Sequence, residues 1–282
     1  MLFRYHLLRN QRELFRTATV KERQEAFLSS PLVRTGLGLS LGLLLTTAIA
    51  TAQQRNFVSC PIVRDTKTVP CFLAEYDGEL YYLGIQQDIT SDFHPPQLKH
   101  EVLVEGRVAP GPRICGGIPL QPVSVSVIKE VNLACNTLLP PEPGIDAPDA
   151  PRGAGPSSRP LDLERAPSAP LTGAHEFTLL YSFNDDYLQF AANAVVNQAA
   201  AYSQKIGASK VKVSGYRATS VLSNGNRLVE KAGLAEKRAQ NIATLLRGLG
   251  VSNVAAEWKQ DAEAGDGQAD ASHRRVTILV TP

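Results

Sequence analysis

An arginine lies on the apolar face of the helix predicted for residues 234–250, LAEKRAQNIATLLRGLG. At 100° per residue the apolar arc contains Leu234, Ala235, Ala239, Ile242, Leu245, Leu246 and Leu249. Arg238 falls inside this arc, and Gly250 is a typical C-terminal stop. A guanidinium on a core-facing surface is costly unless it is paired or reaches water or a ligand. Arg238 is therefore either a snorkelling side chain whose head reaches solvent or a group kept for binding.

The C-terminal part of the chain, residues 174–282, alternates between strand and helix patterns. Helices are predicted within 185–207 and 225–250, and strands over 176–183, 210–216, 253–260 and 273–280. Asp185 and Asp186 stand where a helix N-terminus favours negative charge, so we interpret them as a capping pair. The order β-α-β-α-β-β predicts an α/β sandwich.

Three motifs in this part are similar to one known family. SGY ends a strand, LAEKRA opens a helix and HRRVTILV closes the chain. This combination resembles the OmpA-like peptidoglycan-binding domain, whose patterns are a strand ending G-H-T-D, a helix with L-S-x-x-R-A and a final N-R-R-V strand. The opening FTLLYSFNDDYLQF is similar to the first strand and helix start of that family. The resemblance covers about residues 174–282.

The resemblance implies a ligand for the arginine. Its counterpart in the family binds a carboxylate of diaminopimelate in the peptidoglycan stem peptide, which a planar guanidinium fork matches well. We therefore take Arg238, Arg274, Tyr216 and Arg217 as the candidate ligand-binding residues.

One position departs from the family pattern. Ala218 stands where the motif has its Asp, and Glu230 is the first acid after Gly215. Losing such a charge-assisted partner typically costs about 1.5–3 kcal/mol, or roughly 10- to 100-fold in affinity. Two functions stay open: noncovalent peptidoglycan binding that is weakened by this loss, or an envelope adaptor that binds protein and has lost glycan binding.

The N-terminal 52 residues predict export. Residues 1–34 carry seven Lys/Arg and three Asp/Glu, a net +4, and residues 35–52, TGLGLSLGLLLTTAIATA, are uncharged. Ala50-Thr51-Ala52 has the A-x-A form that signal peptidase cleaves. The alternatives are an uncleaved inner-membrane anchor with a cytoplasmic leader, or a translation start further in, for instance at Val33. We expect the body in the periplasm or cell envelope, associated with the outer membrane or anchored in the inner membrane through residues 35–52.

The middle of the chain predicts a small disulfide-bonded β domain over residues 53–137. All four cysteines, Cys60, Cys71, Cys115 and Cys135, lie there, and an even count after an export signal indicates two disulfides of unassigned pairing. Short alternating runs and a hairpin signal at Asp77-Gly78 favour an antiparallel, half-buried sheet, either a barrel (an OB-like one included) or a sandwich. Residues 138–173, rich in Pro and Ala, predict a linker. The fold class is thus α+β in two domains.

Composition and motifs exclude several function classes. The formal net charge of +2 gives no basis for nucleic-acid binding. The loop 260–272 resembles a calcium loop only faintly, because Gly265 and Asp266 occupy each other's expected positions. We find no set of nucleophile, base or metal ligands, and therefore predict a protein without enzymatic activity, cofactor or metal. Its expected partners are peptidoglycan and other envelope proteins.

Overall fold

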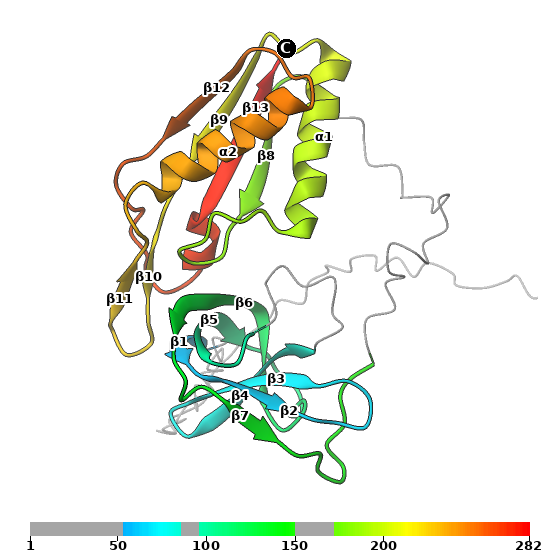
Figure 1. Cartoon of the computed structure of the whole chain (residues 1–282), viewed down its shortest axis with the longest axis vertical. Coiled ribbons are helices and arrows are strands. Elements are labelled where there is room, and N and C mark those ends of the chain that lie inside the picture. Colours follow the sequence, from blue (N-terminus) through cyan, green and yellow to red (C-terminus); the bar gives the residue numbers. More distant parts are fainter. Residues whose placement is uncertain (1–52, 86–95, 150–171) are drawn as a thin grey trace, which may run out of the picture. The chain divides into compact units, whose positions relative to one another are not determined.

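A computed structural model describes residues 53–85, 96–149 and 172–282 (Figure 1). All of these residues belong to one compact unit, Ala50–Pro282. The predicted leader and signal segment, 1–52, and most of the predicted linker lie outside the described residues. None of the described helices combines the length and hydropathy that a membrane crossing requires.

The β region, the described residues from 53 to 149, is built on one seven-stranded sheet. Its strands run in the order β1-β5-β6-β4-β3-β2-β7, with parallel pairing for β4–β6 and β2–β7 and antiparallel pairing elsewhere. Asp77 and Gly78 both have positive φ in the tight turn between β3 and β4, as the sequence predicts. The strands are β1 (Gln54–Ser59), β2 (Pro61–Arg64), β3 (Cys71–Tyr76), β4 (Glu79–Ile85), β5 (His100–Val108), β6 (Ile118–Val131) and β7 (Thr137–Leu139).

Strand β5 is buried on both faces, which differs from the half-buried strand that its alternation predicts. Val102 and Val104 pack into the apolar core of the β region together with Phe57. Leu103, on the opposite face, packs against Phe183 of the C-terminal part of the chain. Because side chains alternate along a strand, β5 has one face for its own core and one for the neighbouring region.

The first part of the predicted linker, 138–149, is folded onto the β region. Strand β7 pairs with β2, Ile145 packs on a buried cluster, and Glu142 forms an ion pair with Arg64 at 3.0 Å. Composition predicted a linker here, but pairing with an available strand edge gives these residues regular structure.

Two disulfides close the β region. Cys60 is bonded to Cys135 and Cys71 to Cys115, so the structure selects one of the three pairings that the sequence leaves open.

The α/β region, residues 172–282, has a four-stranded sheet in the order β12-β9-β13-β8. Both helices cover the same face, because the buried side chains of α1 and α2 share one core with alternate residues of β8, β9 and β13 (Figure 1). The elements are β8 (His175–Leu180), α1 (Phe190–Ile206), β9 (Lys210–Gly215), β10 (Thr219–Val221), β11 (Arg227–Val229), α2 (Leu234–Gly248), β12 (Val254–Trp258), η1 (Asp270–His273) and β13 (Arg275–Thr281).

Two local features differ from the prediction. Helix α1 begins at Phe190 with Gln189 as its N-cap, so Asp185 and Asp186 lie in the preceding loop and do not cap it. The segment between β9 and α2 contains an additional hairpin, β10–β11, which no periodic pattern indicated.

Helix α2 approaches the sheet very closely at Gly215, the last residue of β9. A Cβ atom at this position would overlap the carbonyl oxygen of Ala235 in the first turn of α2. The missing side chain therefore allows the start of α2 to lie directly on the strand.

Candidate functional site

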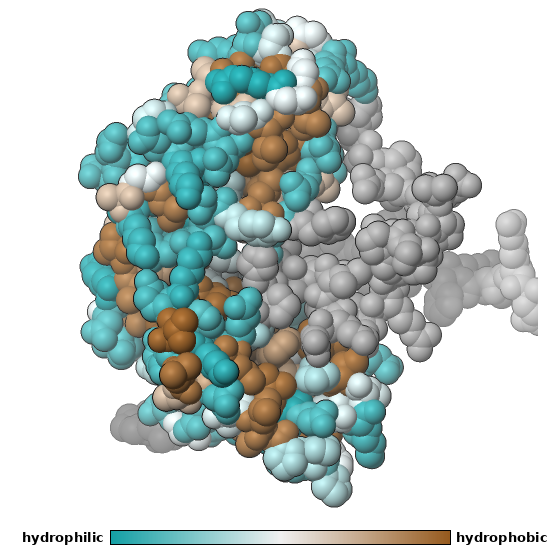
Figure 2. Space-filling view, viewed as in Figure 1, coloured by the Kyte–Doolittle hydropathy of each residue, from teal (hydrophilic) through white to brown (hydrophobic). Residues whose placement is uncertain are grey.

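The buried face of α2 is centred on the arginine. Arg238 is fully buried, whereas Leu245 and Leu249, expected in the apolar arc, are 44% and 42% exposed. Figure 2 shows hydrophobic surface in the area between α2 and α1 as Figure 1 draws them. The residues that α2 buries are Leu234, Ala235, Arg238, Ala239, Ile242, Ala243 and Leu246.

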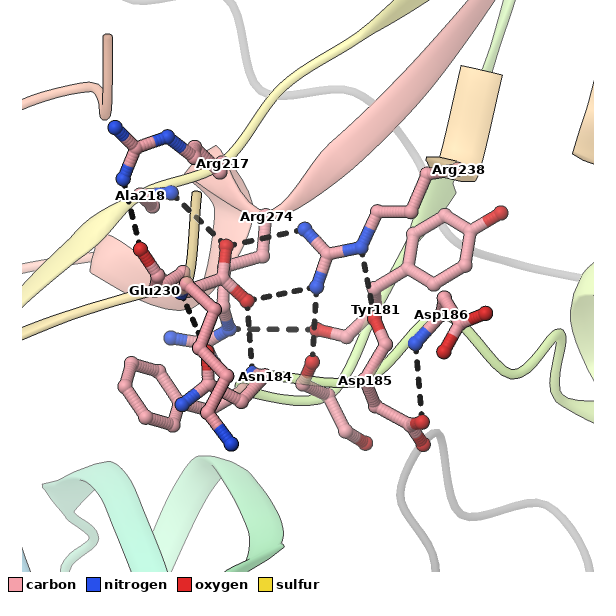
Figure 3. A network of polar contacts seen from close by, with 12 residues as sticks. Tyr181, Asn184, Asp185, Asp186, Arg217, Ala218, Glu230, Arg238 and Arg274 are labelled. Atoms are coloured by element: carbon pink, nitrogen blue, oxygen red, sulfur yellow. Dashed lines mark hydrogen bonds and ion pairs between the residues drawn. The ribbon is translucent and has the colours of Figure 1, made fainter. Parts of the chain in front are cut away.

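All five N–H donors of Arg238 are bound by protein acceptors (Figure 3). Nε donates to the carbonyl of Asp185 at 2.8 Å. The two terminal nitrogens donate to the carbonyls of Tyr216 and Ser182, and both also donate to the carboxylate of Glu230, at 3.0 and 2.7 Å. Arg238 is thus neither a snorkelling side chain nor, in this conformation, a free donor for a ligand.

Glu230 supplies the counter-charge from the end of the β10–β11 hairpin. Its side chain is as fully buried as that of Arg238. Besides the two bonds from Arg238, its carboxylate accepts the backbone N–H of Asn184 and of Ala218, each at 2.9 Å. Figure 3 shows the carboxylate between Ala218 and Arg238, so an acid from a later position lies next to the residue that replaces the motif Asp.

Tyr181 contributes an aromatic face to the same site. The Arg238 guanidinium carbon lies 4.7 Å from the centre of its ring, a distance that suits a cation–π contact. Burial raises the pKa of the Tyr181 hydroxyl well above its ordinary value, and the positive charge of Arg238 opposes this only in part. Among the described residues, the hydroxyl has no hydrogen-bond partner.

Arg274 is the second fully buried guanidinium, and its counter-ion comes from the β region. Its terminal nitrogens donate to both carboxylate oxygens of Glu105 on β5, at 3.0 and 2.5 Å. It also donates to the hydroxyl of Ser220 and to the carbonyl of Tyr181. The side chains of Arg274 and Glu105 are 0% and 4% exposed, so this ion pair is closed to solvent.

Further contacts between the two regions surround this pair. Asn56 of β1 donates its side-chain amide to the carbonyls of Val221 and Gly267, at 3.0 and 2.9 Å. The hydroxyl of Ser126 on β6 accepts the backbone N–H of Phe183 at 2.8 Å. The β1-β5-β6 face therefore covers the loops at one end of the α/β sheet. A cluster of Val58, Leu103, Phe183, Leu222 and Leu228 adds apolar contact.

The other two candidate residues are engaged differently. Tyr216 lies under the guanidinium of Arg275, whose carbon is 4.3 Å from the ring centre. Arg217 donates to the backbone carbonyls of Gln260 and Glu230, at 3.1 and 2.7 Å. Tyr216 and Arg217 thus flank the buried pair of Arg238 and Glu230. Whether these four candidates bind a ligand stays a prediction.

Sequence reasoning missed both acids that complete the site. Glu230 was visible as the first acid after an acid-free loop, and that isolation was the available signal. Glu105 carried a weaker signal, an acid inside the apolar run HEVLVEGRV.

In the loop 260–272, an acid binds the protein's own backbone. The carboxylate of Asp270 accepts the backbone N–H groups of Val221, Asp266 and Gly267. Across the described ranges, His, Cys, Asp and Glu side chains form no group of three or more that could hold a metal ion.

Comparisons with known proteins give similarity to solved structures only. No family model matches the chain, and no curated protein matches it. The peptidoglycan-associated lipoprotein from Burkholderia pseudomallei is 21% identical, with 37% of this chain and 90% of that chain covered at a TM-score of 0.30. The OmpA-like domain of FopA1 from Francisella tularensis subsp. tularensis SCHU S4 is 18% identical, with 38% and 71% covered at 0.29. The periplasmic domain of Helicobacter pylori MotB is 16% identical, with 40% and 78% covered at 0.31.

These identities and TM-scores are low, so nothing about function is argued from them. The chain resembles OmpA-like domains in the motifs of residues 174–282, and solved structures similar to part of the chain include an OmpA-like domain.

Proposed function

We propose that this protein is a non-enzymatic adaptor of the cell envelope, in which the arginine-bearing end of the OmpA-like region binds the protein's own acids and no glycan. The observation that supports this proposal is the saturation of Arg238: all five donors are used, the side chain is fully buried, and its counter-ion Glu230 is equally buried.

The energetics of exchange oppose a ligand at this position. A stem-peptide carboxylate could reach Arg238 only by displacing Glu230, which replaces one charge-assisted pair by another of similar strength. Displacement would also remove Glu230 from the backbone amides of Asn184 and Ala218. The displaced Glu230 would be left as a buried carboxylate without its cation. An uncompensated buried charge costs about 3–5 kcal/mol, which corresponds to roughly two to four orders of magnitude in affinity.

The envelope location rests on the predicted export segment and the disulfides. Both pairs of cysteines are bonded in the β region, and such bonds persist in oxidising compartments such as the periplasm. The proposal includes attachment to a membrane through residues 35–52 where this segment is not cleaved. The partners of an adaptor would be other envelope proteins.

A sedimentation assay with purified sacculi tests the proposal. We expect the full chain to stay in the supernatant, while a peptidoglycan-binding domain run as positive control sediments. Sedimentation of the wild-type chain that a soluble diaminopimelate-containing stem peptide prevents would overturn the proposal and restore the peptidoglycan-binding alternative.

A further inference from the structure

A cavity of about 280 Å³ lies where β5 and β6 meet the loop before η1 and the end of β8. Tyr181 and Ser182, which contact Arg238, also line this cavity, but Arg238 itself does not. The lining is mainly apolar. Its volume lies just below the range typical of sites for drug-sized ligands, so it suits a smaller molecule. The apolar lining includes Pro122, Val123, Leu180, Ala269 and Ala271.

The alternation of side chains along β5 places one cationic side chain, Arg107, at this cavity. Leu103 and Glu105 face the α/β region, where Leu103 packs on Phe183 and Glu105 binds Arg274. Arg107 is the next residue with the same orientation on β5, and it lines the cavity.

The other charged groups that line the cavity are already neutralised. Glu105 is held by both terminal nitrogens of Arg274, and the Asp270 carboxylate is held by backbone N–H groups. Arg107 is exposed, and within the described part of the chain its side chain forms no hydrogen bond or ion pair. The one charge available to a ligand at this cavity is therefore positive.

We propose that this cavity binds a small amphiphilic anion, namely a medium-chain alkyl carboxylate whose chain lies along Val123 and Leu180 and whose carboxylate pairs with Arg107. Leu180 is 49% exposed, and covering it with an alkyl chain removes apolar surface from water. A guanidinium binds a carboxylate through two parallel hydrogen bonds, which gives the headgroup a defined position. Because the ligand contacts both regions, its binding stabilises the docked arrangement.

Titration calorimetry of the full chain with sodium octanoate tests this inference, with octan-1-ol as the neutral probe of equal chain length. We expect octanoate to bind and to raise the unfolding temperature, and octan-1-ol to bind at least about tenfold more weakly, because it lacks the charge-assisted pair. Equal binding of the two probes would overturn the role of Arg107, and absence of octanoate binding would overturn the site.

Two variants with the same change in charge complete the test. Arg107→Gln should weaken octanoate binding at least about tenfold without lowering the unfolding temperature of the free protein, because the side chain is exposed. Lys67→Gln, also in the β region and 74% exposed, should leave binding unchanged, because Lys67 does not line the cavity. Equal effects of the two variants would indicate a general charge effect and contradict the proposal. The outcome is independent of the sacculus assay, which concerns the Arg238 site.

Discussion

The β region and the α/β region bury different kinds of groups. The β region has both disulfides and an apolar core in which Phe57, Tyr81 and Leu83 are almost fully buried. The α/β region has no cysteine, and its largest fully buried side chains are Arg238 and Arg274. One region is held by covalent bonds and apolar packing, whereas the other depends at one end on charges that must be paired.

This difference shows how the two regions depend on each other. Glu230, the partner of Arg238, belongs to the α/β region itself, but Glu105, the partner of Arg274, belongs to the β region. A buried guanidinium without its carboxylate is strongly destabilising. The α/β region is therefore complete only when the β region is docked on it.

Removing the internal partner should produce the largest effect. Glu230→Ala leaves Arg238 buried and uncompensated, so we expect a loss of about 3–5 kcal/mol in unfolding free energy. Urea unfolding followed by the fluorescence of Trp258, the single tryptophan, measures this loss in the α/β region. Glu236→Ala on α2 is the control and should cost less than about 0.5 kcal/mol, because the Glu236 carboxylate accepts a hydrogen bond from the exposed Gln240 and forms no buried ion pair among the described residues. A similar cost for both variants would show that the ion pair is energetically unimportant.

Removing a disulfide should affect the β region more than its neighbour. The double variant Cys71→Ser with Cys115→Ser opens a loop of sequence separation 44 and should destabilise the β region by about 2–5 kcal/mol. Hydrogen exchange should accelerate strongly over residues 71–85 and less over 234–248, which are affected only through the contacts between regions. Equal acceleration of exchange in both segments would mean that the two regions unfold as one unit. The disulfides would then stabilise both regions equally.

The smallest expected effect concerns the unpartnered hydroxyl of Tyr181. Tyr181→Phe removes a buried polar group and should raise stability by about 1 kcal/mol at neutral pH. Burial raises the folded-state pKa of the Tyr181 hydroxyl. The part of the unfolding free energy that depends on its protonation is therefore fully present below the ordinary tyrosine pKa, and it is lost as the pH rises toward the folded-state pKa. Thermal unfolding between about pH 8 and pH 11 should therefore show a steeper alkaline loss for the wild type than for the variant. Parallel curves would refute this interpretation.

The local part of the site could be predicted from the sequence. Helical periodicity placed Arg238 on the buried face of α2, because that inference needs only the spacing of nearby residues. Periodicity set the phase of this face less well: Ala243 is buried, and Leu245, expected there, is partly exposed. The sheet that α2 covers decides which of its residues are buried, and the helix sequence alone does not contain this information.

The partners of the two arginines could not be predicted in the same way. Glu230 lies before a left-handed glycine, Gly233, and outside the helix whose arginine it binds. Glu105 lies more than a hundred residues from Arg274 and in the other region, so no periodic pattern connects them. Composition likewise could not show that residues 138–149 pack onto the β region, because a Pro-rich segment can pair with an open strand edge.

The close contact at Gly215 has a consequence for how this chain can vary. Any side chain there would act as a wedge between β9 and the first turn of α2, and the turn would have to lift away from the sheet. Lifting would withdraw the guanidinium one turn further along from the acid that faces it. The absence of a side chain at Gly215 thus keeps the Arg238 guanidinium within reach of Glu230. A chain altered at this position would need a cationic side chain of a different length to keep the same ion pair.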